Sequence, residues 1–273
     1  MRHPRIALVD SGIGLLAAAA AVRRLRPDAS LVISNDPEGM PWGPRTPADI
    51  TARTLALARA AVTTPPDALI VACNTATVSA LPQLRAELEP AVPVVGTVPA
   101  VKPAAAAGRP LAVWATQAAT ESAYQRDLLD RYAAGLPAVG VPCHGLADAV
   151  ERADEEAVEA AVRAAAALTP PETRTVVLGC THYELVADRI RRHVAAVTGA
   201  EVTLIGSADA VAAQALRRAG LAPHPTAAPG GTLEVFASTR PAALPEVALA
   251  YPEGRLVAAM AGTPASASLG PAS

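Results

Sequence analysis

Residues 68–75 read Ala68-Leu-Ile-Val-Ala-Cys73-Asn74-Thr75, and residues 175–182 repeat their pattern as Thr175-Val-Val-Leu-Gly-Cys180-Thr181-His182. Each stretch is a hydrophobic run, one small residue, a cysteine and then polar residues that can open a helix. Such a run predicts a buried strand that leads into a helix. In an open α/β sheet, ligands bind at the carboxyl ends of such strands. The repeat therefore predicts that Cys73 and Cys180 occupy equivalent positions in two similar lobes.

The rest of the chain alternates in the same way between short apolar runs and longer segments of helical period rich in Ala, Leu and Arg. The predicted strands are residues 5–9, 31–34, 68–72, 93–96, 111–115, 138–141, 175–178, 202–205 and 233–236. One helix is expected over residues 151–166, where acidic residues lead and alanine follows. These runs are many for one sheet. We therefore expect an α/β fold of two similar lobes, each a mostly parallel sheet flanked by helices, with the active site in the cleft between them.

Length and charge narrow the classes of function. The chain has 273 residues, of which 51% are hydrophobic, so it can bury a core. A formal net charge of -2 without a basic run gives no reason to expect a nucleic-acid partner. The apolar run over residues 12–22 resembles the apolar part of a secretory signal, but the polar residues Asp10 and Ser11 directly before it do not fit one. No stretch of the sequence approaches the roughly 18 apolar residues of a membrane span. We expect a cytoplasmic protein that binds a small molecule and no membrane.

The three cysteines cannot all pair, so reduced thiols are expected. A thiol where a strand meets a helix lies near N–H groups of the helix N-terminus, which lower its pKa from about 8.5 and favour the thiolate. The alternative is that these cysteines are small buried hydrophobes, and the repeated setting of Cys73 and Cys180 argues against it. Cys143 has no such motif and is interpreted as structural. With His144 alone beside it, Cys143 lacks the spacing of a metal site.

Four segments resemble the aspartate/glutamate racemase superfamily, and most closely the glutamate racemases. They are Val9-Asp10-Ser11-Gly12-Ile13-Gly14, Pro41-Trp42-Gly43, Val71-Ala-Cys73-Asn74-Thr75-Ala76-Thr77 and Leu178-Gly-Cys180-Thr181-His182-Tyr183. The resemblance covers residues 5–210 in the family's order. It implies a racemase without a cofactor, in which one cysteine enters as thiolate and the other as thiol. This suits the chemistry, because inverting an α-carbon removes a proton from one face and returns one to the other.

The resemblance also implies roles beside the two thiols. Asp10 would assist Cys73 and His182 would assist Cys180, while Glu151 resembles another acidic residue near the site. Each has a plainer interpretation: Asp10 as a turn or helix cap, His182 as a core or surface residue, and Glu151 as the solvated start of a charged helix.

Substrate-binding positions follow from the same resemblance. Ser11, Asn74, Thr75 and Thr181 would surround the amino-acid head group, and residues Pro41, Trp42 and Gly43 would lie near the side-chain carboxylate. Several N–H and O–H donors can hold a carboxylate without arginine. Thr116 matches the family only loosely and could simply cap a helix leading to Tyr124.

The chain departs from the family at three places. Trp42 replaces the usual tyrosine, which leaves substrate specificity open. Leu15 stands where a glycine is common, so the turn after Asp10 is expected to differ in shape. Gly206 precedes Ser207 where the family often has aspartate, which is expected to loosen the joint between the lobes.

Three other functions compete with this interpretation. A racemase that uses pyridoxal phosphate needs a Schiff-base lysine, and Lys102, the only lysine, lies beside prolines without a glycine-rich phosphate loop. A cysteine hydrolase or amidase would need one thiol, with His182 as base. A non-catalytic binding protein would leave the repeated thiols unexplained. The resemblance favours glutamate, with D-glutamate passing to peptidoglycan, and aspartate or another acidic amino acid is the alternative.

By analogy with the family, residues 1–98 and 208–261 form the first lobe and residues 99–207 the second. Residues 262–273 are expected to be a disordered tail, because they are Ala, Ser, Gly and Pro without periodicity. A homodimer is possible, since dimers are common in the family.

Overall fold

The structure is a computed structural model that describes residues 3–259. Its strands are β1 (Arg5–Val9), β2 (Ser30–Asn35), β3 (Ala68–Val71), β4 (Val94–Gly96), β5 (Leu111–Ala115), β6 (Ala138–Pro142), β7 (Thr175–Leu178), β8 (Thr203–Ile205), β9 (Leu233–Ala237) and β10 (Arg240–Ala242). They form a six-stranded sheet in the order β10-β9-β2-β1-β3-β4 and a four-stranded sheet in the order β6-β5-β7-β8. Every pairing is parallel except that of β9 with β10.

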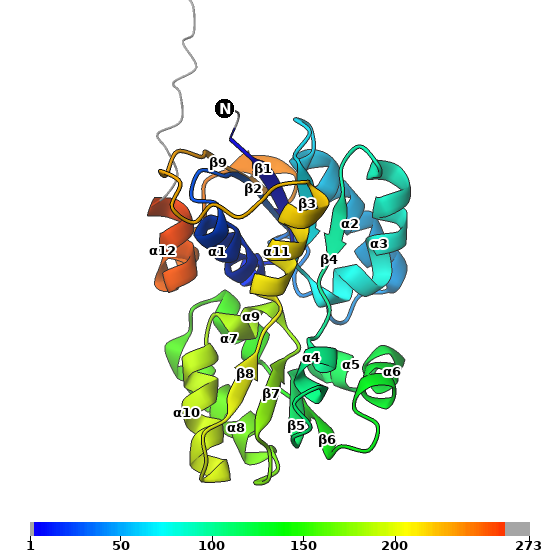
Figure 1. The fold of residues 1–273 in the computed structure, drawn as a ribbon, viewed down its shortest axis with the longest axis vertical. Helices are drawn as coiled ribbons and strands as arrows, with labels where there is room; N and C mark the ends of the chain where they lie inside the picture. The colour runs from blue at the N-terminus through cyan, green and yellow to red at the C-terminus, as the bar shows by residue number, and fades with distance from the viewer. Residues whose placement is uncertain (1–2, 260–273) are drawn as a thin grey trace, which may run out of the picture.

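The two sheets share one topology. The order β2-β1-β3-β4 in the first corresponds strand by strand to β6-β5-β7-β8 in the second. We call the part of the molecule around the six-stranded sheet the first lobe and the part around the four-stranded sheet the second lobe; they are the upper and lower halves of Figure 1. This arrangement confirms the predicted α/β fold.

Helices cover the faces of both sheets. They are η1 (Ile13–Leu15), α1 (Leu16–Leu25), α2 (Pro47–Ala61), α3 (Asn74–Leu88), α4 (Val101–Ala105), α5 (Gln117–Thr120), α6 (Ala123–Tyr132), α7 (Leu146–Glu151), α8 (Glu155–Ala167), α9 (Thr181–Glu184), α10 (Ala187–Thr198), α11 (Ala208–Arg218), η2 (Glu246–Ala250) and α12 (Pro252–Ala259). The alanine-rich N-terminal run is α1, which is buried from Leu16 to Arg23. It packs against α11, α12 and α9, so it joins the first lobe to the second. No helix within residues 3–259 has the length and apolar character of a membrane span.

Two local predictions differ from the structure. Strand β10 was not predicted, because its residues are exposed and include Pro241, so no apolar run marks it. The single helix expected over residues 151–166 is wrong: α7 ends at Glu151 and α8 starts at Glu155. Between them Ala153 has a left-handed φ of 49°, and the Asp154 side chain caps α8 by accepting from the Ala157 N–H at 3.0 Å.

The chain crosses between the lobes twice, after β4 and after β8 (Figure 1). At the second crossing the Ser207 N–H and hydroxyl donate to Glu184 Oε1 at 2.8 and 2.9 Å, and the expectation that Gly206 loosens this joint stays a prediction. The division at residues 98/99 and 207/208 into two lobes that fold as units stays a prediction. The predicted tail over residues 262–273 lies outside the described residues.

Candidate active site

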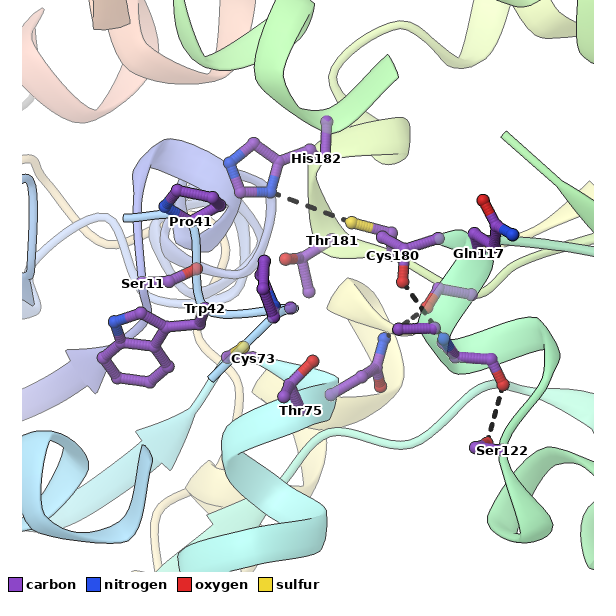
Figure 2. Close-up of a pocket in the computed structure, with 18 of the residues that line it drawn as sticks. Ser11, Pro41, Trp42, Cys73, Thr75, Gln117, Ser122, Cys180, Thr181 and His182 are labelled. Atoms are coloured by element: carbon purple, nitrogen blue, oxygen red, sulfur yellow. Dashed lines mark hydrogen bonds between the residues drawn. The ribbon is translucent and has the colours of Figure 1, made fainter. Parts of the chain in front are cut away.

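The two repeated cysteines follow corresponding strands. Cys73 lies after β3 and is the N-cap residue of α3, and Cys180 lies after β7 and is the N-cap residue of α9. Because β3 and β7 have the same place in their sheets, both thiols stand at the carboxyl ends of equivalent strands. They line one pocket of about 500 Å³ that residues of both lobes enclose (Figure 2).

Nearly all of the predicted site residues line this pocket. They are Asp10, Ser11, Pro41, Trp42, Gly43, Cys73, Asn74, Thr75, Thr116, Cys180, Thr181 and His182. Glu151 is not among the lining residues, because it lies behind His182 and contacts that ring. The wall also contains residues that no motif predicted, among them Met40, Gln117, Tyr124 and Cys143. Only their place in the folded chain brings them to the pocket.

Cys180 is paired with a buried imidazole. The Sγ atom of Cys180 lies 3.8 Å from Nδ1 of His182 (Figure 2), and Nε2 of His182 lies 2.8 Å from Oε2 of Glu151. Burial disfavours the charged ring, but the contacts with Cys180 and Glu151 outweigh it, so the pKa of His182 is raised well above its usual value of 6.5. The direction of this shift favours the protonated form of the ring beside the sulfur.

Glu151 also ties the two lobes together. The same Oε2 atom accepts from the Ile13 N–H of the first lobe at 2.8 Å. The segment after Asp10 can approach Glu151 and His182 this closely because it contains glycines. A Cβ on Gly12 would lie 2.2 Å from Glu151 Oε2, and one on Gly14 would lie 2.7 Å from His182 Nδ1. Glu151 is the end of α7 and points inward, so its interpretation as a solvated helix start is wrong. Leu15, the departure in this turn, is buried in η1.

Cys73 has a different partner. Asp10 is 1% exposed, and its Oδ1 accepts from the Ser11 N–H at 2.6 Å while its Oδ2 accepts from the Thr181 hydroxyl at 3.2 Å. Burial raises the pKa of Asp10, and the charge of His182 offsets part of this effect. Burial, followed by the charge of Asp10, also raises the pKa of the Cys73 thiol, although N–H groups at the start of α3 oppose it. The helix N-terminus acts in the predicted direction on Cys73, but burial and Asp10 outweigh it, so the prediction of a lowered pKa is wrong for this thiol.

The predicted binding residues include further contacts between the lobes. The Asn74 side-chain NH₂ donates to the Gly179 carbonyl at 2.9 Å, and its Oδ1 is buried without a hydrogen-bond partner. Thr116 lines the pocket and also caps α5, since its hydroxyl accepts from the Ala119 N–H at 3.3 Å. Ser122, rather than Thr116, caps the helix that contains Tyr124.

Trp42 stands where the resemblance led us to expect a tyrosine. Its side chain is buried, and its indole N–H donates to Asp36 Oδ2 at 3.0 Å. Arg53 donates to the same carboxylate oxygen at 3.0 Å, so a partly buried ion pair holds this N–H in place. Figure 2 shows the indole directed away from the two labelled cysteines. Trp42 therefore contributes apolar surface to the pocket and no free polar group.

The remaining nucleophilic groups lie elsewhere or in the wall. Lys102 is in α4 with its Nζ 5.9 Å from the centre of the Tyr132 ring, and it is not a lining residue. Cys143 is buried in the pocket wall, where its thiol donates to the Val141 carbonyl at 3.5 Å. No group of three or more His, Cys, Asp or Glu side chains that could hold a metal ion occurs within residues 3–259.

Comparisons with known proteins agree with this geometry. A model of the Asp/Glu/hydantoin racemase family matches residues 14–215. A glutamate racemase of Pseudomonas putida is 36% identical over 253 residues, which cover 90% of this chain and 93% of the relative. A glutamate racemase of Roseiflexus sp. is 35% identical over 79% of this chain and 80% of the relative. The Escherichia coli glutamate racemase, solved with L-glutamate and the activator UDP-MurNAc-Ala, superposes with a TM-score of 0.76 at 28% identity over 91% of this chain and 92% of that chain.

Proposed function

The chain belongs to the Asp/Glu/hydantoin racemase family, and from this premise we propose that it interconverts L- and D-glutamate without a cofactor by proton transfer between Cys73 and Cys180. One observation carries the proposal: two thiols, one from each lobe, line the same pocket, and each has its own acid–base partner. The names of the relatives support glutamate as the substrate.

Proton transfer in this scheme uses the different states of the two thiols. Cys180, beside the protonated His182, acts as thiolate and takes the Cα proton, so that an S–H bond forms as the Cα–H bond breaks. The Cys73 thiol then gives its proton to the opposite face of the planar carbanion, which inverts the centre. The opposite enantiomer is turned over with the roles exchanged. Asp10 and His182 assist by exchanging protons with Cys73 and Cys180.

Neutral donors are proposed to hold the substrate. The hydroxyls of Ser11, Thr75 and Thr181 and the free Oδ1 of Asn74 line the pocket near the thiols, where they can bind the α-amino and α-carboxyl groups. The segment Pro41-Trp42-Gly43 is proposed to contact the side-chain carboxylate. Since Trp42 offers no free polar group there, aspartate or another acidic amino acid is the alternative substrate.

We propose further that the protein acts in the cytoplasm and supplies D-glutamate to peptidoglycan synthesis, as the resemblance to glutamate racemases implies. A homodimer stays a prediction from the same resemblance, and light scattering of the purified protein would test it.

Hydrogen exchange at Cα tests the reaction itself. Each enantiomer of glutamate and aspartate is incubated in deuterium oxide with the wild type, Cys73→Ala, Cys180→Ala and the matched thiol variant Cys143→Ala. Nuclear magnetic resonance follows loss of the Cα proton, and circular dichroism follows inversion. Either active-site substitution is expected to lower inversion in both directions by about a thousandfold, whereas Cys143→Ala retains it within about tenfold. Inversion that persists in Cys73→Ala would contradict the two-thiol mechanism.

A second function is favoured by one specific arrangement. Cys180, His182 and Glu151 form a nucleophile, a base and an orienting carboxylate in series, which is also the layout of a cysteine hydrolase. Such an enzyme needs Cys180 and tolerates Cys73→Ala. Release of ammonia or acid from amide or ester substrates by the Cys73→Ala variant, without inversion by the wild type, would favour the hydrolase.

A further inference from the structure

Glu184 carries a contact that the proposed chemistry does not use. It is the last residue of α9, the one-turn helix that also contains Thr181 and His182 and whose N-cap residue is Cys180. Its Oε1 accepts from the Ser207 N–H at 2.8 Å, the Ser207 hydroxyl at 2.9 Å and the Ala208 N–H at 3.2 Å. One carboxylate oxygen thus binds three neutral donors from a segment more than twenty residues further along the chain.

Those donors belong to the N-terminus of α11. Ser207 is the N-cap residue of that helix, yet its own side chain does not cap it, because its hydroxyl is turned toward Glu184. Glu184 supplies the missing cap: its Oε1 accepts from two N–H groups at the positive end of the helix that have no partner within α11. Gly206 permits this approach, since a Cβ there would lie 2.4 Å from Glu184 Oε2.

The contact spans the junction of the lobes. Helix α9 belongs to the second lobe, whereas α11 packs against α1, β3 and β4 of the first lobe, and Figure 1 shows α9 directly below α11. The crossing from β8 to α11 passes through Gly206 and Ser207. Glu184 therefore connects the helix that carries the Cys180 side of the pocket to the strand–helix layer that carries Cys73.

We infer that Glu184 is a positioning residue, whose cap on α11 fixes α9 against the first lobe and thereby sets the placement of Cys180 and His182 across the pocket from Cys73. The inference rests on the proposed function. It assigns no proton transfer to Glu184, which is not a lining residue of the pocket.

The test compares Glu184→Ala with Glu184→Gln and with a control carboxylate. Glutamine keeps an oxygen that accepts from Ser207, so Glu184→Gln should retain kcat within about threefold. Glu184→Ala should lower kcat in both directions by about 10- to 100-fold, with a smaller change in KM, because small misplacements of reacting groups slow the reaction strongly. Glu89→Ala is the matched control: Glu89 also accepts a backbone N–H, from Val94 at 3.0 Å, and pairs with Arg218 of α11, but it lies away from α9.

A second readout is independent of the reaction. The rate of Cys180 alkylation by iodoacetamide, followed against pH by peptide mass spectrometry, reports the pairing of that thiol with His182. We expect the profile to move in Glu184→Ala and to match the wild type in Glu184→Gln and Glu89→Ala. A wild-type profile and wild-type kcat in Glu184→Ala would overturn the inference, as would equal losses in Glu184→Ala and Glu89→Ala. If the wild type inverts no amino acid, the proposed function fails while the alkylation profile still decides the role of Glu184.

Discussion

Cys73 and Cys180 share a sequence setting but differ in their surroundings. His182 stands in the Cys180 motif itself, whereas Asp10, from the end of β1, and Glu151, from the end of α7, come from other parts of the chain. An acid beside a buried thiol favours its protonated form, and an imidazolium beside a thiol favours the thiolate. The motifs alone therefore predict a pair of thiols, and the fold is required to show how Asp10 and Glu151 complete their different surroundings.

This asymmetry predicts the order of chemical modification. At pH 7.5, iodoacetamide should alkylate Cys180 at least about tenfold faster than Cys73, because the thiolate is the nucleophile and burial with Asp10 raises the pKa of Cys73. Peptide mass spectrometry over a time course measures both rates. Asp10→Asn should speed the modification of Cys73, since it removes the nearby negative charge. Faster labelling of Cys73 than of Cys180 in the wild type would refute the assignment.

The raised pKa of His182 predicts a pH-dependent stability. The folded protein holds the His182 proton more tightly than the unfolded chain does, so this stabilisation is fully present below a pH of about 6.5 and is lost as the pH rises through the raised pKa. We expect the difference in free energy of unfolding between wild type and His182→Gln to shrink above pH 6.5 by up to about 1.4 kcal/mol per pH unit. Urea denaturation at a series of pH values measures it. A difference that grows with pH would have the wrong sign.

At the scale of elements, apolar runs located the strands well, because short stretches of consecutive apolar residues mark most of them in the sequence, including β6, β8 and β9, which are only partly buried. Each predicted run overlaps an observed strand. The prediction failed where local polar contacts decide the structure: Asp154 and the left-handed Ala153 divide α7 from α8, and β10 is an exposed hairpin strand. The cap on α11 could not be predicted from the sequence either, because Glu184 and Ser207 come together only in the folded chain.

The turn between β1 and α1 offers a test at this scale. A Cβ on Gly14 would lie 2.4 Å from the Thr181 hydroxyl and 2.7 Å from His182 Nδ1, so Gly14→Ala must push the turn away from α9. We expect a loss of turnover of about a hundredfold and a decrease of about 1–3 kcal/mol in the free energy of unfolding. Gly230→Ala is the control, because a Cβ there meets only the His3 side chain, at 3.2 Å. Steady-state kinetics and urea denaturation measure the two effects, and equal behaviour of both variants would contradict the steric argument.

At the scale of the molecule, the predicted site residues themselves hold the lobes together. Asp10 accepts from Thr181, Glu151 accepts from the Ile13 N–H and Asn74 donates to the Gly179 carbonyl, and each of these bonds joins one lobe to the other. We expect that an opening of the cleft would break these bonds and that closing would restore the arrangement around both thiols. We therefore predict that substrate binding is coupled to the assembly of the site, as in enzymes that close around a substrate.

The Ile13 N–H reports this coupling at a single position. It stands at the start of η1 and donates across the cleft to Glu151 at 2.8 Å, so its exchange with solvent follows the contact between the lobes. In Glu151→Ala the Ile13 amide should exchange at least about tenfold faster, while amides within β1 keep their wild-type rates. Glu151→Gln retains an acceptor oxygen, so it should keep most of the protection of Ile13. Saturating D-glutamate should slow exchange at Ile13 in the wild type, because closure engages the bond more of the time. If neither Glu151→Ala nor the ligand changes the exchange rate of the Ile13 amide, the lobes do not move against each other at this contact.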